Sequence, residues 1–434
     1  MYNLMIIYYN NNDIYNNIVL NMINNSNNKE ILLKYIEKKK NKNNSIKKQF
    51  FNPPLIGLKS INSHKYINAI LQCFCQIDIF VNYFKYTMNF NLNNSNNNNI
   101  YLFTSFKYLI ENLWPSIDEY LNNEYIHQNN VNKYFSPIDF NDKISKMNTN
   151  FNPDNNSSEK EFINFIIITI HNELNKAEIN NNINNNNQLI DEKNKSLMQS
   201  LFMQNFVKEN KSIISDLFYG MKEISIKCKN CNIIKYNYQK YYYVEFPIYE
   251  IFKLKKKNNE QRFTLPNSIT ILNDNDIRNS ANVFDNNKII NSLSIYDCFD
   301  YLEKINNFNN NNKIFCNYCN KTSSFCYKIF LNTIPAILII IINSKKGINI
   351  NIKFDFYEDL NLEKYVEFKS TGYTFKLFGI VEKNSVENHY LAYVKSPIDN
   401  NWYKYNDDKV LNVNNFQKEI LKSNNPCILF YQKK

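Results

Sequence analysis

The sequence predicts an α+β protein, and three observations lead to that class. Residues 101–114 and 161–175 place apolar side chains at helical spacing on one face. Residues 241–248 alternate in character and residues 334–342 form a short continuous apolar run, and both patterns are typical of strands. Two C-x-x-C pairs accompany the strand-like part of the chain and indicate a metal site. Helical patterns followed by strand patterns favour an α+β fold.

Length and charge exclude little. A chain of 434 residues can bury a large core, and length alone suggests two or three domains, although an enzyme fold of this size also forms one unit. The formal net charge is +11, but the Lys residues are scattered and accompany heavy use of Asn, Ile, Tyr and Phe. A nucleic-acid footprint is therefore only weakly indicated, and nucleic acid is not the partner we expect.

Cysteine usage and hydropathy indicate the compartment. Nine cysteines, four of them in C-x-x-C pairs, argue against a disulfide scaffold and for a reducing environment with a metal site. The first residues lack a basic n-region, and the longest apolar run, residues 334–342, is far shorter than the ~18 residues needed to span a bilayer. We expect a cytoplasmic and/or nuclear protein with no membrane partner.

The first segment differs from the rest in composition. Residues 1–52 are rich in Asn and Lys and predict a mostly disordered leader, with a short helix possible at 31–36. Pro53 and Pro54 mark the boundary with one domain, residues 53–434. Within that domain, Asn-rich stretches are expected to be surface insertions; they lie at residues 93–99, 180–187 and 307–312.

The cysteine pairs are the most specific ligand signal. Cys228/Cys231 and Cys316/Cys319 predict two tight knuckles between strands, whose four thiolates would surround a structural zinc with Zn–S bonds of ~2.3 Å and no open position. The alternative is four unrelated buried cysteines. The remaining cysteines are expected to be ordinary thiols; they are Cys73, Cys75, Cys298, Cys326 and Cys427.

Three stretches resemble boxes of the ubiquitin-specific proteases, also called ubiquitin carboxyl-terminal hydrolases. Residues 57–74, G-L-K-S-I-N-S-H-K-Y-I-N-A-I-L-Q-C-F, resemble the cysteine box, which runs G-L-x-N-L-G-N-T-C-Y-M-N-S-x-L-Q-x-L. Residues 136–175 resemble the second box, and residues 373–410, with H-Y-L-A-Y-V-K and then W-Y-K-Y-N-D-D, resemble the histidine box. The zinc pairs follow the family's order, so the resemblance covers about residues 55–434.

This resemblance implies the α+β papain-like cysteine protease hand of the family. The helical thumb would comprise about residues 57–210, and the zinc-binding β fingers about residues 224–334. The β palm would comprise about residues 336–434. The cofactor implied is structural zinc, and the partner implied is ubiquitin or a ubiquitinated protein, with a possible assembly partner besides.

The family's catalytic positions are only partly retained. Its nucleophilic Cys aligns with Lys65, and its oxyanion-stabilising Asn aligns with Ser60. The resemblance makes His389 the general base, Asn406 the residue that orients it and Asp407 a second polar partner. A lysine ammonium is a protonated non-nucleophile at neutral pH, so this site is predicted to be inactive.

The resemblance also implies positions that contact ubiquitin. These are Gln72, Ser158, Glu161 and Tyr390. Ser158 stands where members carry an Asp that helps to hold the ubiquitin tail. A neutral Ser should hold an Arg-rich tail less strongly, because charge-assisted hydrogen bonds are about twice as strong as neutral ones.

The expected function is a non-catalytic domain that serves as a ubiquitin- or protein-binding scaffold. One alternative is an active cysteine-type deubiquitinase in which the register differs or another thiol, such as Cys73, is recruited. Another is the family's inactive splicing-associated branch, which the run N-A-I-L-Q at residues 68–72 resembles, although that branch usually lacks the zinc cysteines and the His. A zinc-dependent nucleic-acid binder remains a third class.

Overall fold

The computed structural model describes most of the domain that the sequence predicts. The described residues are 53–61, 64–88, 101–115, 134–177, 191–263, 292–304, 306–307, 314–343, 352–366, 372–384, 389–416, 420–421 and 426–434. The expectations for the leader at residues 1–52, for the helix at 31–36 and for nearly all of the Asn-rich stretches lie outside these residues.

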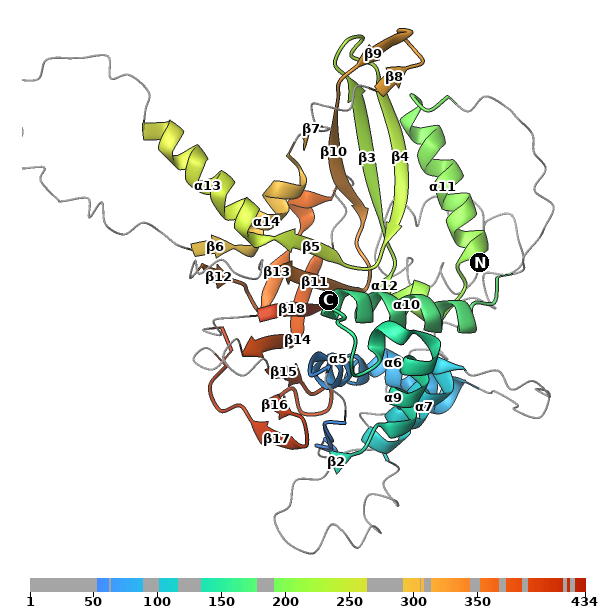
Figure 1. Ribbon diagram of the computed structural model, residues 1–434, viewed down its shortest axis with the longest axis vertical. Coiled ribbons are helices and arrows are strands. Elements are labelled where there is room, and N and C mark those ends of the chain that lie inside the picture. Colours follow the sequence, from blue (N-terminus) through green and yellow to red (C-terminus); the bar gives the residue numbers. More distant parts are fainter. Residues whose placement is uncertain are drawn as a thin grey trace, which may run out of the picture.

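A helical layer forms the first half of the described chain (Figure 1). Its elements are α5 (Tyr66–Cys75), α6 (Asp78–Asn82), the π-helical turn η1 (Tyr83–Thr87), α7 (Leu102–Leu113), α9 (Ile138–Met147), the 3-10 turn η4 (Thr149–Phe151), α10 (Glu159–Leu174) and α12 (Ile213–Phe218). Helix α11 (Lys195–Glu209) lies apart from this layer and packs against β4 (Ile234–Tyr241) (Figure 1). The predicted helices at 101–114 and 161–175 are confirmed as α7 and α10. Ser158 caps α10 as its sequence position indicates.

Helix α5 is the centre of the molecule, and every one of its ten residues is buried. The helix packs against β14 (Thr374–Asn384) and β15 (His389–Lys395) of the palm sheet. Gly379 of β14 makes this approach possible, because a Cβ there would lie 3.2 Å from Cys73 Sγ. Helical layer and sheet therefore share one core, and α5 carries its first residues to their interface.

The palm is an eight-stranded mixed sheet in the order β17-β16-β15-β14-β18-β11-β5, with β13 paired to β14. Its remaining strands are β5 (Val244–Pro247), β11 (Ile337–Asn343), β13 (Asp359–Asn361), β16 (Trp402–Asn406), β17 (Lys409–Asn412) and β18 (Pro426–Lys433). Only the β11–β5 pair is parallel among the pairs described in this sheet.

Strand β11 explains the continuous apolar run of the sequence. Ile337, Ile339 and Ile341 belong to the core shared with the helices. Leu338, Ile340 and Ile342 belong to a second core on the opposite face of the sheet. A strand buried on both faces has no polar side to alternate with, as predicted.

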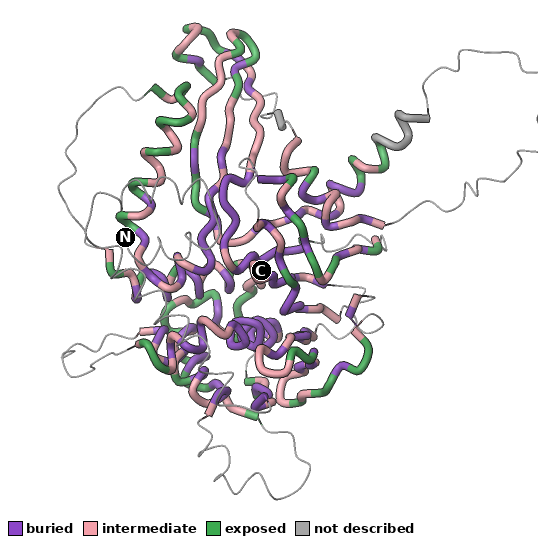
Figure 2. Tube along the Cα trace, turned by 180° about the vertical axis from the view of Figure 1, so that it is seen from behind, coloured by how far each residue is buried: buried purple, intermediate pink, exposed green. Residues whose placement is uncertain are grey.

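The fingers are a second sheet in the order β4-β3-β10-β7 that rises from the palm (Figure 1). Its strands are β3 (Gly220–Cys228), β4 (Ile234–Tyr241), β10 (Phe325–Thr333) and β7 (Asn306–Asn307), and the hairpin β8 (Ile314–Cys316)–β9 (Lys321–Ser323) lies at its tip. Figure 2 shows buried residues concentrated in the palm and the helical layer, whereas the fingertip is mostly intermediate or exposed.

Shorter elements complete the fold. They are β1 (Gly57–Leu58), β2 (Tyr134–Phe135), α13 (Ile248–Phe263), β6 (Ser292–Ser294), α14 (Ile295–Leu302), β12 (Lys353–Asp355) and η5 (Glu363–Tyr365). The residue range predicted for the fingers also contains β5, which pairs with β11 of the palm, so palm and fingers interleave along the chain.

No single helix among the described residues is long and apolar enough to cross a membrane. The segments Tyr66–Cys75 and Asp78–Thr87 are long and apolar enough only when they are taken together, and the chain bends by 78° between them.

Candidate functional site

Lys65 lies immediately before the first residue of α5, at the N-cap position. Its ammonium Nζ donates a hydrogen bond of 3.1 Å to Ser60 Oγ. Both side chains are half-buried. The two positions that the resemblance assigns to nucleophile and oxyanion donor are thus adjacent in space, and both carry other chemical groups.

Three contacts join the turn after β16 to β1 and to the start of α5. Asn68 Nδ2 donates to Asp407 Oδ1 at 2.7 Å, and Leu58 N donates to the Asp407 carbonyl at 2.8 Å. Gly57 passes so close to this turn that a Cβ there would lie 2.4 Å from the Asp408 carbonyl oxygen. Asp407 itself has a φ of 49°, a left-handed conformation that Asp adopts more readily than most residues. These contacts hold β1 and the start of α5 against that turn without using Lys65. The site that comprises Ser60, Lys65, His389, Asn406 and Asp407 is called the cleft below.

The structure brings together the three polar residues that the resemblance to the histidine box singled out. His389 Nε2 and Asn406 Oδ1 are 2.5 Å apart, and we assign the ring nitrogen as the donor. Asp407 Oδ2 lies 4.0 Å from the same nitrogen. His389 begins β15 and Asn406 ends β16, so the antiparallel pairing of these strands places them side by side. The predicted base and its predicted orienting partner are therefore in contact.

The residues assigned to ubiquitin contact lie in two settings. Ser158 and Glu161 form a capping box at the start of α10, in which Ser158 N donates to Glu161 Oε2 at 2.8 Å. Gln72 is only 2% exposed, and its amide donates to the Ile56 carbonyl at 3.1 Å. Tyr390 is also buried, and its hydroxyl donates to Glu159. Their roles toward ubiquitin stay predictions.

Sequence reasoning missed the contacts that join α10 to the palm. Glu159 accepts from Tyr390 of β15 and lies 3.9 Å from Lys383 of β14. Burial raises the pKa of Tyr390, and the neighbouring Glu159 raises it further. Lys160 forms an ion pair with Glu245 of β5. No local pattern announces such pairs, because their members lie far apart along the chain.

All nine cysteines lie in the described part of the chain, and none stands at the start of α5. Cys73 and Cys75 are fully buried within α5, and burial raises the pKa of both thiols. Cys427 donates its thiol hydrogen to the Val381 carbonyl at 3.2 Å, and burial raises its pKa as well. These thiols are poor sources of thiolate.

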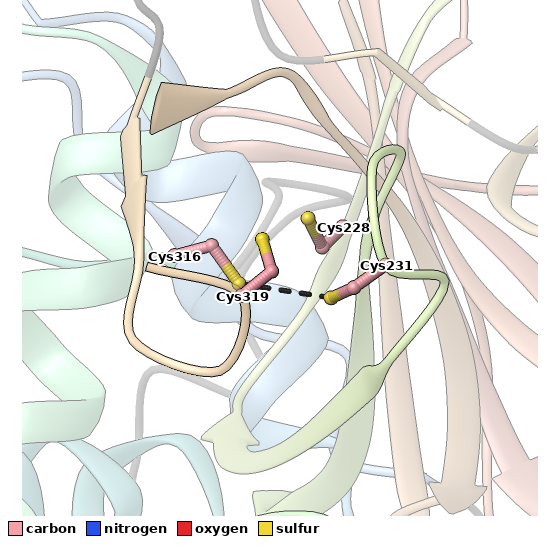
Figure 3. A group of neighbouring side chains, drawn as sticks. All are labelled: Cys228, Cys231, Cys316 and Cys319. Atoms are coloured by element: carbon pink, nitrogen blue, oxygen red, sulfur yellow. Dashed lines mark hydrogen bonds between the residues drawn. The ribbon is translucent and has the colours of Figure 1, made fainter. Parts of the chain in front are cut away.

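The two cysteine pairs converge at the fingertip (Figure 3). The sulfur atoms of Cys228, Cys231, Cys316 and Cys319 all lie within 4.8 Å of one another. Cys231 Sγ and Cys316 Sγ are 3.8 Å apart, far beyond the ~2.05 Å of a disulfide and equal to the edge of about 3.8 Å expected for a tetrahedron of ~2.3 Å Zn–S bonds. Four thiol sulfurs in this arrangement can hold zinc.

The knuckles have a common local design. Each pair is followed at once by an Asn with positive φ, Asn232 at 61° and Asn320 at 50°. Asn tolerates this left-handed conformation, which closes the tight turn. Cys228 N donates to the Ile233 carbonyl at 3.0 Å and thereby closes its knuckle. The repeated C-x-x-C-N was a sequence signal for these turns that the spacing argument did not use.

The surroundings of two thiols favour ionisation. Burial would raise the pKa of Cys228, but hydrogen bonds from Ser323 and from backbone N–H groups outweigh it and lower the pKa to about 6. The Asn230 side chain, which donates to Cys319 Sγ at 3.3 Å, lowers the pKa of Cys319. Thiolate is the form that binds a metal, so the surroundings of Cys228 and Cys319 fit a zinc site. A backbone hydrogen bond with Ile233 lowers the pKa of Cys231, but burial and the three neighbouring thiols outweigh it and raise that pKa to about 11.

Comparison with known proteins places these observations in a family. Residues 56–431 match the model of the family described as Ubiquitin carboxyl-terminal hydrolase. Ubiquitin carboxyl-terminal hydrolase 2 of Bos taurus is 21% identical over 392 residues, which cover 87% of this chain and 55% of that protein. Ubiquitin carboxyl-terminal hydrolase 4 of Saccharomyces cerevisiae is 22% identical over 410 residues, which cover 87% of this chain and 39% of that protein. The chain spans about half the length of the curated relatives it matches.

Solved structures show the same fold. The SAGA Ubp8/Sgf11/Sus1/Sgf73 DUB module bound to ubiquitin aldehyde contains a chain with a TM-score of 0.55 and 18% identity to this one. The match covers 88% of this chain and 70% of that chain. The predicted α+β hand with thumb, palm and fingers is thereby confirmed.

Proposed function

This chain belongs to the ubiquitin carboxyl-terminal hydrolase family, and from that premise we propose that it is a catalytically inactive member that binds ubiquitin or a ubiquitinated protein without cleaving it. One observation carries the proposal. The position at the start of α5 that must present a thiolate presents the ammonium of Lys65, hydrogen-bonded to Ser60.

The chemistry of the family explains the consequence. A cysteine protease needs a thiolate, a base that accepts its proton and donors that stabilise the oxyanion. Here the base His389 and its partner Asn406 are in contact, but no thiol stands opposite them. Loss of a protease nucleophile costs on the order of 10⁶ in turnover, and loss of an oxyanion donor a further ~10²–10³ where the effects are independent.

Recruitment of another thiol is disfavoured by position and ionisation. Cys73 lies eight residues beyond Lys65, in the helix that Lys65 precedes. Its relative exposure is 0%, so its thiol is not accessible to solvent or to a ligand. Cys75 is equally buried. Bringing either sulfur to the cleft would require α5 to leave its place between the helical layer and the palm.

The proposal that the chain binds ubiquitin is supported by the contacts retained around the Lys65 position. Gly57 and Leu58 of β1 and Asn68 of α5 contact the β16–β17 turn, and His389 and Asn406 are in contact with each other. The structurally similar SAGA DUB module is bound to ubiquitin aldehyde, and on that ground we propose ubiquitin as a partner of this chain as well. The zinc that the fingertip would hold is structural, because four thiolates leave no position for water.

A ubiquitin probe with a C-terminal electrophile tests the proposal directly. The purified protein should not form a covalent adduct, and it should not cleave a ubiquitin amide, while ubiquitin binding should be measurable. The variant Lys65→Cys with Ser60→Asn should regain activity on the order of 10³ above its matched control, Lys65→Ala with Ser60→Asn, because only the first supplies a thiol to His389.

Two results would contradict the proposal. One is reaction of the unmodified protein with the probe at a mapped cysteine, which would show that a buried thiol reaches the cleft. The other is cleavage of a ubiquitin amide by the unmodified protein, at a rate that the substitution Lys65→Ala does not reduce. A further His389→Ala change in the restored variant should abolish the regained activity and so identify the base.

A further inference from the structure

We propose that the cleft is a receptor for the free C-terminal carboxylate of ubiquitin, the product form of the family's reaction, in preference to ubiquitin joined through an amide. This inference rests on the proposed function that the chain binds ubiquitin without cleaving it. It adds which chemical form of ubiquitin the site selects, and it assigns Lys65 a positive role.

The charge of Lys65 is available for such a ligand. Among the described residues its ammonium makes one polar contact, the 3.1 Å hydrogen bond to the neutral hydroxyl of Ser60, and no described carboxylate lies within ion-pair distance of it. The nearby carboxylate of Asp407 is engaged elsewhere, by Asn68 Nδ2 at 2.7 Å and beside His389 Nε2 at 4.0 Å. An ammonium has three N–H donors, so two remain for a ligand.

The position of that charge relates it to the end of the ubiquitin tail. Lys65 occupies the start of α5. By its resemblance to the family's cysteine box, this is the position of the sulfur that attacks the terminal carbonyl carbon, and Ser60 stands at the oxyanion position. A ligand that reached this point with a free carboxylate would present two anionic oxygens to the Lys65 ammonium and the Ser60 hydroxyl. The resulting hydrogen bonds would be charge-assisted.

An amide-linked tail offers less at the same place. Its carbonyl oxygen is neutral, and its N–H is a donor that would face a site already rich in donors. Neutral hydrogen bonds are about half as strong as charge-assisted ones. The replacement of a nucleophile by a cation therefore converts a site for breaking an amide into a site that prefers the acid released when the amide is broken.

Binding of two ubiquitins that differ by one charge tests this selectivity. Full-length protein is titrated with ubiquitin carrying its native C-terminal carboxylate and with ubiquitin whose C-terminus is a carboxamide. We expect the carboxylate form to bind about tenfold more tightly at low salt, as one partly desolvated charge-assisted contact would give, and the preference should shrink as ionic strength rises. Lys65→Gln should abolish the preference, so that the carboxylate and carboxamide forms bind with affinities within about twofold of each other.

A matched variant separates the site from the general basic charge of the chain. Lys59→Gln removes one positive charge from the same segment, but the Lys59 side chain is exposed and is not part of the cleft contact with Ser60. It should retain the preference for the carboxylate. Equal loss of preference in the Lys59 and Lys65 variants would overturn the proposal in favour of long-range electrostatics.

The outcomes also distinguish this inference from the proposed function. Equal binding of both ubiquitin forms by the unmodified protein would overturn the carboxylate receptor and leave the non-catalytic ubiquitin-binding domain standing. Binding of neither form would overturn both. Adduct formation with the electrophilic probe would overturn catalytic inactivity, whatever the binding preference.

Discussion

The fingertip and the cleft are the two places where this fold concentrates reactive side chains, and they have different compositions. At the fingertip all four sulfur atoms are present within 4.8 Å of one another. In the cleft His389 and Asn406 remain in contact, but Lys65 and Ser60 stand where a nucleophile and an oxyanion donor would act. The predicted zinc ligands are all present, whereas the predicted nucleophile position carries a lysine.

The difference follows from what each site contributes to folding. Among the described residues, the buried cluster at the fingertip consists of Phe325, Cys228 and Cys316, so we expect a metal to be needed to hold the two hairpins together. In the cleft, α5 is held by its buried faces and by Asn68, which are independent of the reactive position. Chemistry can therefore be lost from the cleft while the fold persists.

Removal of the metal should have the largest effect on stability. Cys228→Ser, or chelation, should abolish binding of one zinc per chain and unfold the fingertip first, with ~10–16 kcal/mol from small zinc peptides as an upper guide. Metal analysis and hydrogen exchange over β3, β4, β8 and β9 measure this. The control Cys326→Ser changes a partly exposed thiol on β10 that lies outside the cluster. Unchanged stability in Cys228→Ser would show that the hairpins hold without metal.

A smaller effect should come from acid, and it arises in the helical layer. His171 is 4% exposed and its Nδ1 lies 2.7 Å from Ser212 Oγ. Burial, and secondarily Lys240, lower its pKa from 6.5 to about 4, although Asn210 opposes the shift. As the pH falls, His171 of the unfolded chain therefore takes up a proton near pH 6.5, whereas His171 of the folded chain does so only near pH 4. The free energy of unfolding consequently decreases between these two pH values, by up to about 3 kcal/mol.

Denaturant unfolding at pH 7 and pH 5 measures this contribution of His171. His171→Gln should reduce the loss of stability between the two pH values. Since acid also protonates zinc-binding thiolates, the His171 variant sharpens the comparison by removing the part of the acid effect that does not come from the fingertip. An identical pH dependence with and without His171 would refute the assignment.

Loss of the α5 anchor should cost less again. Asn68→Ala removes the amide that contacts the Leu58 and Lys59 carbonyls and Asp407 Oδ1, with an expected loss of roughly 1–3 kcal/mol in the free energy of unfolding. Thermal and urea unfolding provide the measurement. Lys59→Ala, which changes only an exposed side chain of the same segment, is the control. A loss no greater than the control's would mean that packing alone positions α5.

The smallest effect is expected at the reactive position itself. Lys65→Ala removes one half-buried hydrogen bond to Ser60 and should change the free energy of unfolding by less than about 1 kcal/mol. The same unfolding experiments detect it. A loss larger than that of Asn68→Ala would make Lys65 a structural residue and would remove the contrast between the cleft and the fingertip.

Much of the architecture was accessible from local pattern. The helical spacing of residues 101–114 and the apolar run at 334–342 predicted α7 and β11, because periodicity reports which faces are buried. The pattern could not reveal that β5 joins the palm between parts of the fingers. That pairing with β11 bridges residues almost a hundred positions apart, and nothing local encodes it.

By itself the sequence determined which chemistry is available: the absence of a thiol at position 65, the retained His389 and the four paired cysteines are matters of residue identity. Only the tertiary structure decided which of these groups meet. In the fold the four cysteine sulfurs lie close together, and His389 contacts Asn406. Gln72 donates to the Ile56 carbonyl, and the two thiols of α5 are buried. The physical reason is that identity fixes what a side chain can donate, accept or bind, whereas proximity, burial and the resulting pKa depend on contacts between segments distant along the chain.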